Sequence, residues 1–585
     1  MNIMSFDCIV RGGTIVDGTG AEKFVGDIGI RDGYVAEVAP LIEAKGSTEI
    51  DATGLIVAPG IIDLHTHYDA QLHWDPYCTT SGWHGSTTVV IGNCGFGFAP
   101  VRPGSEERYM RMMENTEQVP YEVMQQALPW TWNTFPEWFE HLKNLPKGVN
   151  VATYLPTNAL ISYVIGPDEA KTRPSTPEEK AEMARLLDEA MDAGASGFAL
   201  SYLGEAGNSH VDHDQSPMPT DIMAEEDIYN LADVLGRRGD GTVMLLGELP
   251  GMKDPRRHVA EEVARRTGGS VLYNIVMVND RDPEQHRDFL RWLDEMTAKG
   301  LNIWGQAFAH RKPLDINPMH WDQWNAVPIF RTLSAAHSVE DKKALVIDPA
   351  YRDRFHREYD PKRMTEAGGR IERYILVEAE GSEKLAPYYG RHLEDIATEL
   401  GEHFIDVFLD SMYDTDMRVL YSSIENTGHN TDYVAEMLGH PRVLGGTSDG
   451  GAHSKHGNGG FWSTDILLHL THETNAFTLE QAHHLLGLKG AQAFGLTDVG
   501  AIRPGYTADL MIYDFDALDY QPRGKYVVVN DFPGGDWRKV TYALGIRHIL
   551  VNGVETFRDG KETGATPGRM FTTSRASTRE MLAAE

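Results

Sequence analysis

The sequence has 585 residues, of which 41% are hydrophobic, so it is long enough for one large domain with a smaller one beside it. Its 53 lysines and arginines stand against 86 aspartates and glutamates, and the formal charge of -33 disfavours nucleic acid and anionic membranes as partners. The sequence has no signal-peptide pattern, no apolar run of membrane-spanning length and only three scattered cysteines, from which we expect a cytoplasmic protein.

The two ends of the chain predict short β-strands without amphipathic helices between them. The N-terminal "IVRGGTIVDGTG" and the later "RHILVNGVETFRDG" are β-rich runs punctuated by glycine and Asp-Gly turns. We expect residues 1–57 and 499–585 to build one small β-sandwich together.

From Leu55 onward, eight short β-rich runs alternate with helical stretches. Such alternation is typical of parallel strands joined by crossover helices, and eight strands suggest a closed barrel. We therefore predict an α/β fold in which residues 58–498 form a (β/α)8 TIM barrel. The runs are "LIVAPGIIDLHTH", "STTVVIGNC", "GVNVATYL", "SGFALSYL", "TVMLLGEL", "SVLYNIVMV", "LNIWGQAF" and "RVLGGTSD".

One helix between these runs carries clear start and stop signals. Thr176 can cap it, Pro177 suits its first turn and Glu179 completes a capping box, while Gly194 ends it before the fourth run. Between the seventh and eighth runs lie more residues than a connection needs. We predict an insertion there, at about residues 310–400, near the functional face of the barrel.

The first run ends in two histidines, His65 and His67, separated by one residue. Alternate residues of a strand project to the same side, so both imidazoles can face the mouth of a barrel, where they would suit zinc or a similar divalent ion. An isolated pair of this kind is as often two ordinary polar residues that leave a strand.

Two further candidates follow other runs. Cys94 lies between glycines after the second run, and Asp449 ends the eighth run, which in a closed barrel neighbours the first. A thiolate and a carboxylate there can bind metal, and the carboxylate can also take a proton from water. The plainer alternatives are a small buried core residue for Cys94 and a surface residue in a glycine-rich turn for Asp449.

The motifs "DLHTHYD", "VVIGNCGFG", "TSDGGAH" and "GAIRPGYTADLMIYD", in this order, resemble the amidohydrolase superfamily, and specifically its D-aminoacylase or N-acyl-D-amino-acid deacylase branch. The resemblance spans most of the chain. It implies hydrolysis of an amide C-N bond by water activated at one or two divalent metal ions, usually zinc. It also implies that His65, His67, Cys94 and Asp449 hold the metal, and that Asp449 moves the proton from the water to the leaving nitrogen.

The sequence departs from that family at the fifth and sixth runs. Members with two metals carry a histidine at the end of each, and a lysine that binds the substrate carboxylate, and all three are missing here. Glu248 in "GELPG" is a candidate replacement ligand, and Asn274 stands about where the second histidine is expected; both can equally be structural. His453 is a candidate substrate-facing residue, and His310, His429 and His456 are weaker ones.

The aromatic loop after the first run includes Tyr68 and Trp74, which are candidates to line a substrate pocket. The segment "LPWTWNTFPEWF" is a weaker candidate for the same role, and packing in the core is the alternative for both.

We predict a small-molecule amide substrate and a homo-oligomer. Because the lysine that binds the carboxylate is missing, a bulky or neutral N-acyl amide is an alternative to an N-acyl-D-amino acid as substrate. A cyclic amidase that opens an imide, hydantoin or diketopiperazine-like ring is an alternative activity, and a metal-free binding or scaffold protein is an alternative of another class.

Overall fold

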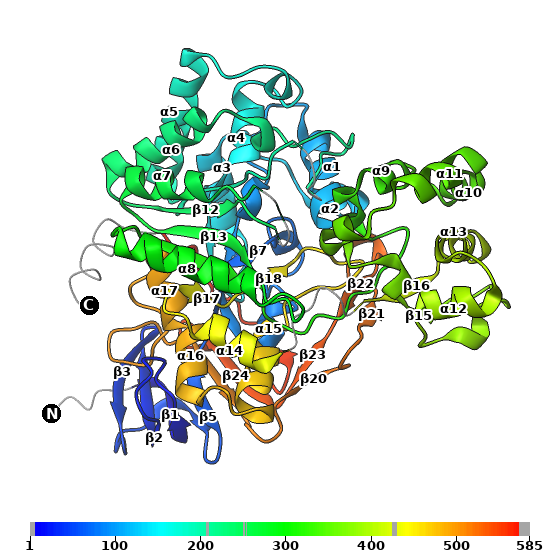
Figure 1. Ribbon diagram of the computed structural model, residues 1–585. Coiled ribbons are helices and arrows are strands. Elements are labelled where there is room, and N and C mark those ends of the chain that lie inside the picture. The colour runs from blue at the N-terminus through cyan, green and yellow to red at the C-terminus, as the bar shows by residue number, and fades with distance from the viewer. Residues whose placement is uncertain (1–5, 206–209, 250–251, 253, 424–429, 573–585) are drawn as a thin grey trace.

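The computed structural model describes residues 6–205, 210–249, 252, 254–423 and 430–572. Figure 1 shows a main body built of strands and helices, with a group of helices to its right. None of the described helices is both long enough and apolar enough to cross a membrane.

The main body is organised around parallel strands that follow the eight predicted runs. Their pairings are β6-β8-β9, β10-β11-β12-β13-β14-β17 and β18-β7, all parallel. Because β6 and β7, β9 and β10, and β17 and β18 are each successive parts of one stretch of chain, the described ladders join into a ring that closes on itself. The strands are β6 (Ile61–Asp63), β7 (His65–Thr66), β8 (Ser86–Ile91), β9 (Asn150–Thr153), β10 (Leu155–Pro156), β11 (Gly197–Ser201), β12 (Thr242–Leu246), β13 (Val271–Val276), β14 (Ile303–Ala307), β17 (Val443–Leu444) and β18 (Thr447–Gly450).

Helices cover the outside of this ring, so its strands are buried on both faces and consist of nearly continuous apolar residues. The helix with the clearest sequence signals is α5 (Pro177–Ala193); its predicted capping box between Thr176 and Glu179 is confirmed, as is Gly194 at its end. Other helices of the main body are α3 (Phe135–Asn144), α4 (Thr157–Val164), α6 (Glu225–Arg238), α7 (Arg257–Thr267), α8 (Glu284–Ala298), α14 (Thr431–Gly439), α15 (Trp462–Leu467), α16 (Leu479–Leu486) and α17 (Leu488–Phe494).

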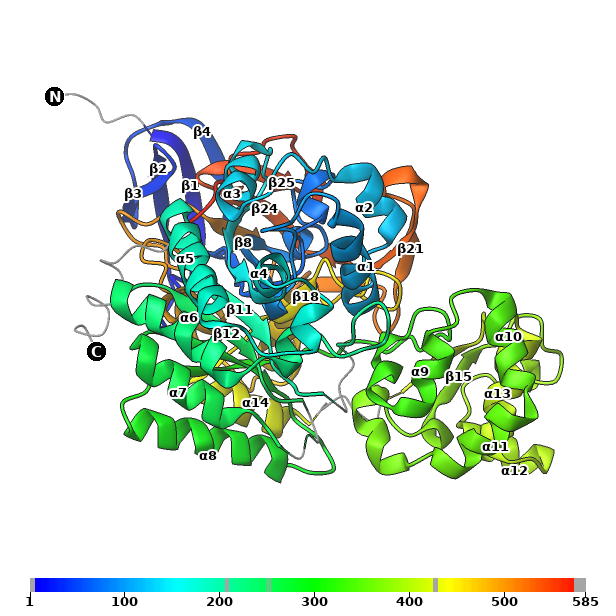
Figure 2. The same cartoon turned by 90° about the horizontal axis from the view of Figure 1, so that it is seen from above.

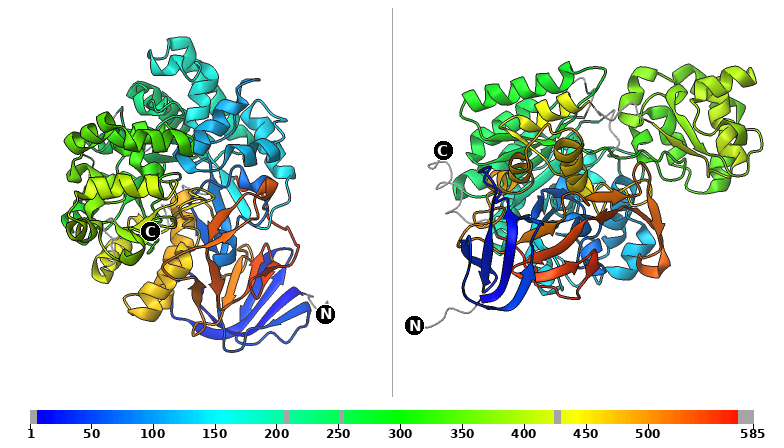
Figure 3. Two further views of the ribbon diagram at one scale, coloured as in Figure 1. Left: turned by 90° about the vertical axis from the view of Figure 1, so that its right-hand side faces the viewer. Right: turned by 90° about the horizontal axis from the view of Figure 1, so that it is seen from below.

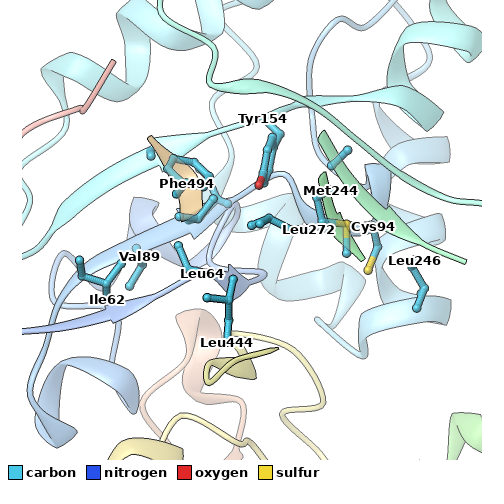
Figure 4. Packing of buried hydrophobic residues seen from close by; sticks show 14 of the residues in the cluster. Ile62, Leu64, Val89, Cys94, Tyr154, Met244, Leu246, Leu272, Leu444 and Phe494 are labelled. Atoms are coloured by element: carbon cyan, nitrogen blue, oxygen red, sulfur yellow. The ribbon is translucent and has the colours of Figure 1, made fainter. Parts of the chain in front are cut away.

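The core lies inside the ring and under its helices. Figure 4 shows side chains from several strands packed with Phe494 of α17, among them the fully buried Leu272 and Leu444. Cys94 lies to one side of this cluster and Val89 to the other. The ring is therefore a packed interior, with Cys94 toward one end of it.

The two ends of the chain share one nine-stranded sheet. Its main path runs β26-β25-β24-β19-β5-β1-β2-β3, with β4 paired to β1. Antiparallel pairing of β5 with β19 joins the N-terminal strands to the C-terminal ones. The strands are β1 (Phe6–Ile15), β2 (Phe24–Arg31), β3 (Tyr34–Ala39), β4 (Gly46–Asp51), β5 (Ile56–Pro59), β19 (Leu510–Tyr513), β24 (Ile546–Val551), β25 (Val554–Arg558) and β26 (Lys561–Glu562). Two short ribbons, β20 (Asp519–Gln521) with β23 (Tyr542–Leu544) and β21 (Val527–Val529) with β22 (Arg538–Val540), lie beside it.

A satellite lobe, residues 316–421, stands beside the main body, on the side away from the N-terminal strands (Figures 2 and 3). It has its own apolar core, in which Trp324, Phe330 and Phe408 are fully buried. The lobe lies where the sequence predicts an insertion, but its core continues to Tyr421, beyond the expected end near residue 400. Its elements are α9 (Pro328–Ser334), α10 (Val339–Ile347), α11 (Pro349–Glu358), α12 (Leu393–Leu400), α13 (Phe404–Asp414), β15 (Ile375–Glu378) and β16 (Leu420–Ser422).

Candidate metal centre

His65 and His67 lie at the carboxyl end of the first ring strand, and both are buried. The backbone of β7 is held by β18, where Thr447 pairs with His65, and the His67 amide donates to the Gly450 carbonyl at 2.7 Å. Burial lowers the pKa of both imidazoles, which favours the neutral form that a metal requires. The nearest ring partner of His65 is the side-chain amide of Asn274, 2.9 Å from Nδ1.

Cys94 follows β8 in a tight turn, with its own φ at 55° and positive φ at the glycines on either side, Gly92 and Gly95. A side chain at Gly95 would place its Cβ 2.9 Å from the Ala199 carbonyl oxygen, so the turn needs a residue without one. The turn brings the Cys94 Sγ to 3.4 Å from Nε2 of His65. Burial raises the pKa of this thiol well above its usual range, so a thiolate here requires a cation beside it.

Asp449 comes from the eighth ring strand, and its Oδ1 lies 3.4 Å from Nε2 of His65 and 3.9 Å from Nε2 of His67. Burial raises the pKa of Asp449, but the neighbouring histidines lower it further, to about 2, so the group is a carboxylate at neutral pH. Its side chain is 19% exposed, the most open of the group. Asp449 can therefore reach both a metal and a bound substrate.

These four side chains fit a divalent metal ion. Two imidazole nitrogens, a thiolate and a carboxylate are ligand types of zinc, and ligand atoms around a tetrahedral ion lie about 3.3–3.7 Å apart. The measured spacings of 3.4, 3.4 and 3.9 Å come close to that range. The ligand atoms of His65, His67 and Cys94 all lie within 4.8 Å of one another.

A fifth residue of the group, Glu117, has no signal in the sequence that predicts it. It is the last residue of α1 (Glu106–Glu117), is 1% exposed, and its Oε2 lies 3.7 Å from Nε2 of His67. Its Oε1 has no hydrogen-bond partner among the described residues. Burial, with Asp449 nearby, raises the pKa of Glu117 well above its usual range. A glutamate at a helix end is normally exposed to solvent. The sequence therefore gives no sign that Glu117 is buried beside His67, and only the tertiary structure shows it.

The group forms one wall of a cavity of about 200 Å³. Facing it are apolar side chains of the strand ends and the satellite lobe, namely Leu246, Leu249, Ile275, Met277, Val278, Phe308, Leu314 and Trp321. His453 and His456 also line the cavity, as does His210. Apart from histidines, Lys312 is the one basic residue among the described lining residues, and it forms no ion pair with a described carboxylate. The sequence does not single out Lys312, which lies in the loop after β14.

The structure does not bring Glu248 to the centre. Both of its carboxylate oxygens accept hydrogen bonds from Arg257, at 2.7 Å each, and it does not line the cavity. Because both carboxylate oxygens of Glu248 are paired with the Arg257 guanidinium, neither is free to bind a metal ion. Asn274 contacts His65 rather than standing in for a histidine ligand.

The aromatic residues proposed as pocket lining pack elsewhere. Tyr68 is fully buried and its hydroxyl donates to Ser81 Oγ, while Trp74 packs edge-on against Phe532. In the second aromatic segment, Trp132 and Trp138 pack against each other in the core, with ring centroids 4.5 Å apart. Neither set is among the described residues that line the cavity, and both pack against other side chains instead.

Of the weaker histidine candidates, His310 is buried beside Phe308 and Phe461 and does not line the cavity. His429 lies outside the described residues.

Comparisons with known proteins identify the family of the chain. A family model described as "Amidohydrolase family" matches residues 48–229 and 365–557. The chain is 28% identical to an uncharacterized protein of Mycobacterium tuberculosis over 96% of this chain and 93% of that one. It is 26% identical to an N-acyl-D-aspartate deacylase of Alcaligenes xylosoxydans xylosoxydans, over 97% of this chain and 95% of the relative.

The solved structure of D-aminoacylase superposes with a TM-score of 0.63 at 22% identity, over 97% of this chain and all of that one, so the two share a fold. The predicted resemblance to the D-aminoacylase branch is confirmed by these matches, and with it the predicted class of enzyme. Because the family model covers more than half of its residues, the chain belongs to the amidohydrolase family.

Proposed function

We propose that this chain hydrolyses the amide bond of a small N-acylated compound, in the manner of an N-acyl-D-amino-acid deacylase, with a divalent metal ion held by His65, His67, Cys94 and Asp449. The observation that carries the proposal is the meeting of these four side chains, from the ends of three ring strands, at the wall of one cavity. A hydrolytic site at the carboxyl ends of such strands is the usual placement in this architecture.

The same proposal assigns the architecture in detail. The closed ring of parallel strands with outer helices is a (β/α)8 TIM barrel over residues 58–498, interrupted by the satellite lobe. The shared sheet of residues 1–57 and 499–585, with its ribbons, is the small β-sandwich. The closure of the ring by β18 and β7 supports the first assignment, and the pairing of β5 with β19 supports the second.

The ligand set suits zinc, because it combines imidazole and thiolate donors with one carboxylate. When bound, such an ion supplies Lewis acidity that polarises an amide carbonyl and makes water more acidic. The chain's own residues then handle the protons. Asp449, ionised and partly open to the cavity, accepts a proton from the attacking water and delivers it to the leaving nitrogen, so that one water and one amide become a carboxylic acid and an amine.

The residues that line the cavity indicate the chemical groups that a substrate would carry. Its apolar wall suits an acyl or aryl group, and Lys312 supplies a cation for an anionic group such as a carboxylate. Burial lowers the pKa of Lys312, and the charges of Asp449, Asp322 and Glu117 oppose this effect, although none of these described residues forms an ion pair with it. Lys312 can thus bind a substrate carboxylate in place of the lysine that the family carries after the sixth strand. Lys312 itself lies in the loop after the seventh strand.

The test is a metal-dependent assay on a panel of amides. The purified chain is stripped with a chelator, assayed, reloaded with zinc and assayed again on N-acyl-D-amino acids, N-acyl-L-amino acids, neutral amides and cyclic imides or hydantoins. We expect activity on linear N-acyl compounds that disappears with the metal and returns with it. Turnover confined to cyclic compounds would favour a cyclic amidase, and a fully metal-loaded chain inactive on every amide would favour the scaffold alternative.

Self-association and location in the cytoplasm stay predictions. Analytical ultracentrifugation of the metal-loaded chain would test the first, with a sedimenting mass well above 65.1 kDa expected for a homo-oligomer.

A further inference from the structure

A second group of metal-type ligands lies beside the same cavity, and it shares no residue with the group at Cys94 and His65. It consists of Asp322, which begins a short 3-10 turn of the satellite lobe (Asp322–Ala326), and of His453 and His456 in the loop after β18. His453 and His456 line the cavity directly. All three side chains are buried, at 9% exposure or less.

The ligand atoms of this group have the spacing of a coordination sphere. The two carboxylate oxygens of Asp322 lie 3.5 Å from Nδ1 of His453 and 3.3 Å from Nε2 of His456, and one ligand atom from each residue falls within 4.8 Å of the others. Atoms bound to one tetrahedral zinc ion are about 3.3–3.4 Å apart when the ligands are nitrogen and oxygen. The match is as close as in the first group.

The histidines of the group lack the hydrogen bonds that buried imidazoles normally have. His456 is 2% exposed, and its Nδ1 has no hydrogen-bond partner among the described residues, while its Nε2 and Nδ1 of His453 face the Asp322 carboxylate at 3.3 and 3.5 Å without the geometry of a hydrogen bond. A buried polar atom left unpaired is costly, and these imidazole nitrogens face the carboxylate at a separation that suits an ion between them better than direct hydrogen bonds. Both histidines and the carboxylate would be satisfied at once by a cation between them.

We infer that Asp322, His453 and His456 form a second divalent-cation site, which takes zinc or a similar transition-metal ion. It is separate from the site at Cys94, because its three ligands are all different residues. None of its ligands comes from the fifth or sixth strand, whose runs contain no histidine in this chain. The inference does not depend on the hydrolytic activity.

The position of Asp322 means that an ion at this site would link the satellite lobe to the main body. Asp322 and its neighbours Trp321 and Gln323 belong to the satellite lobe, whereas His453 and His456 belong to the main body. The Trp321 ring already packs on His456, with centroids 4.7 Å apart. A cation held jointly by the two parts would fix the lobe residues that form one side of the cavity. The other ring nitrogen of His453, Nε2, lies 4.0 Å from Glu117 and from Asp449, so this imidazole connects the two sites.

The experiment counts ions and identifies one of them by its spectrum. The full-length chain is stripped of metal, reloaded with Co²⁺ as the probe, freed of excess ion and measured by elemental analysis. An absorption band from thiolate-to-cobalt charge transfer reports the ion at Cys94 alone, since the second group has no sulfur ligand. We expect about two ions per wild-type chain, and about one in Asp322→Asn and in His456→Gln, with the thiolate band unchanged in both.

The matched control is Asp315→Asn. This carboxylate precedes the lobe and pairs with Lys539 at 2.6 Å, so its loss removes a charge and an attachment of the lobe without touching the proposed ligands. It should bind two ions. Cys94→Ser should lose the thiolate band and keep the second ion.

Two results would overturn the inference. One is a wild-type chain that binds a single ion and shows the full thiolate band. The other is a count of two that persists in both Asp322→Asn and His456→Gln. The thiolate band and the far-UV circular dichroism of each variant show whether it is folded, so a misfolded variant cannot be mistaken for one that has lost the second site. The number of ions bound by the wild-type chain tests the inference without any variant.

Discussion

The side-chain amide of Asn274 lies 2.9 Å from Nδ1 of His65, so the sixth ring strand positions a proposed metal ligand that the first strand carries. The oxygen and nitrogen of an amide occupy equivalent space, and the oxygen is the atom that would accept from Nδ1-H. With the proton fixed on Nδ1, Nε2 presents its lone pair to the centre, next to Cys94 and Asp449.

Replacing Asn274 should therefore weaken metal binding. We expect Asn274→Leu to raise the dissociation constant for zinc roughly 10- to 100-fold, the usual effect of losing such a supporting hydrogen bond. Asn274→Asp keeps an acceptor and should retain more of the affinity. Competition with a chromogenic chelator measures both constants, and equal affinities in Asn274→Leu and wild type would remove this role.

Asp449→Asn tests the proton transfer. The amide has nearly the same shape but cannot accept the proton from water, so we expect kcat to fall by roughly 10²- to 10⁴-fold. The assay is run with metal content measured on the same sample, because Asp449 is also a proposed metal ligand. Near-normal kcat at full metal loading would exclude Asp449 from proton transfer.

Lys312→Met tests the anionic anchor. A charge-assisted hydrogen bond is worth roughly 1.5–3 kcal/mol, so kcat/KM should fall about 10- to 150-fold for substrates with a carboxylate. The matched neutral substrate, with a carboxamide in place of the carboxylate, should change little. Equal losses on the two substrates would mean that Lys312 supports the fold rather than the ligand.

Buried histidines should make the chain sensitive to acid. His483 lies in α16, its Nε2 is 2.8 Å from the Tyr513 hydroxyl, and burial lowers its pKa from 6.5 to about 4. Between pH 6.5 and 4 the imidazole is protonated in the unfolded chain but not in the folded one. The contribution of His483 to the free energy of unfolding is therefore complete above pH 6.5, falls as the pH drops toward 4, and is lost below that pH. The loss from this one group approaches about 3 kcal/mol.

The variant His483→Gln removes that titration. Its unfolding free energy in urea should depend less steeply on pH between 6.5 and 4 than that of wild type, even if its value at pH 7 is lower. The slopes are compared between the two proteins, and identical slopes would show that His483 titrates normally in the folded chain.

The helix α5 offers a test of local structure. Thr176→Ala removes one half of its capping box and should cost about 1 kcal/mol of unfolding free energy. Thr176→Ser keeps the acceptor oxygen and should be close to wild type. A cost as large for serine as for alanine would point to lost packing of the methyl group instead.

The sequence predicts those parts of the site that follow ring strands directly. His65, His67, Cys94 and Asp449 each lie at or just after a strand end, so finding the strands is enough to place them on one face. Glu117 ends a helix and Lys312 lies in a loop, and their distance from the centre depends on how these segments pack.

The misplaced residues have the same origin. Glu248 follows the fifth strand as expected, but nothing local indicates that Arg257 returns to pair with it. Asp322, which the sequence does not single out, belongs to the satellite lobe, and the contact of this lobe with the main body cannot be predicted from periodicity. Tyr68 and Trp74 are aromatic enough for a pocket or a core, and only the tertiary structure distinguishes the two.

The closure of the ring by β18 and β7 also constrains how the chain is made. The hydroxyl of Ser448 donates to the His65 carbonyl across 383 residues of sequence, and β5, just ahead of His65, pairs with β19 still later in the chain. During synthesis β7 therefore has no β18 to pair with until most of the polypeptide has left the ribosome. Contacts of such long range form slowly. The candidate metal centre can therefore form only late in folding, and a nascent chain that ends before residue 447 would carry His65 and His67 with no closed ring to hold them.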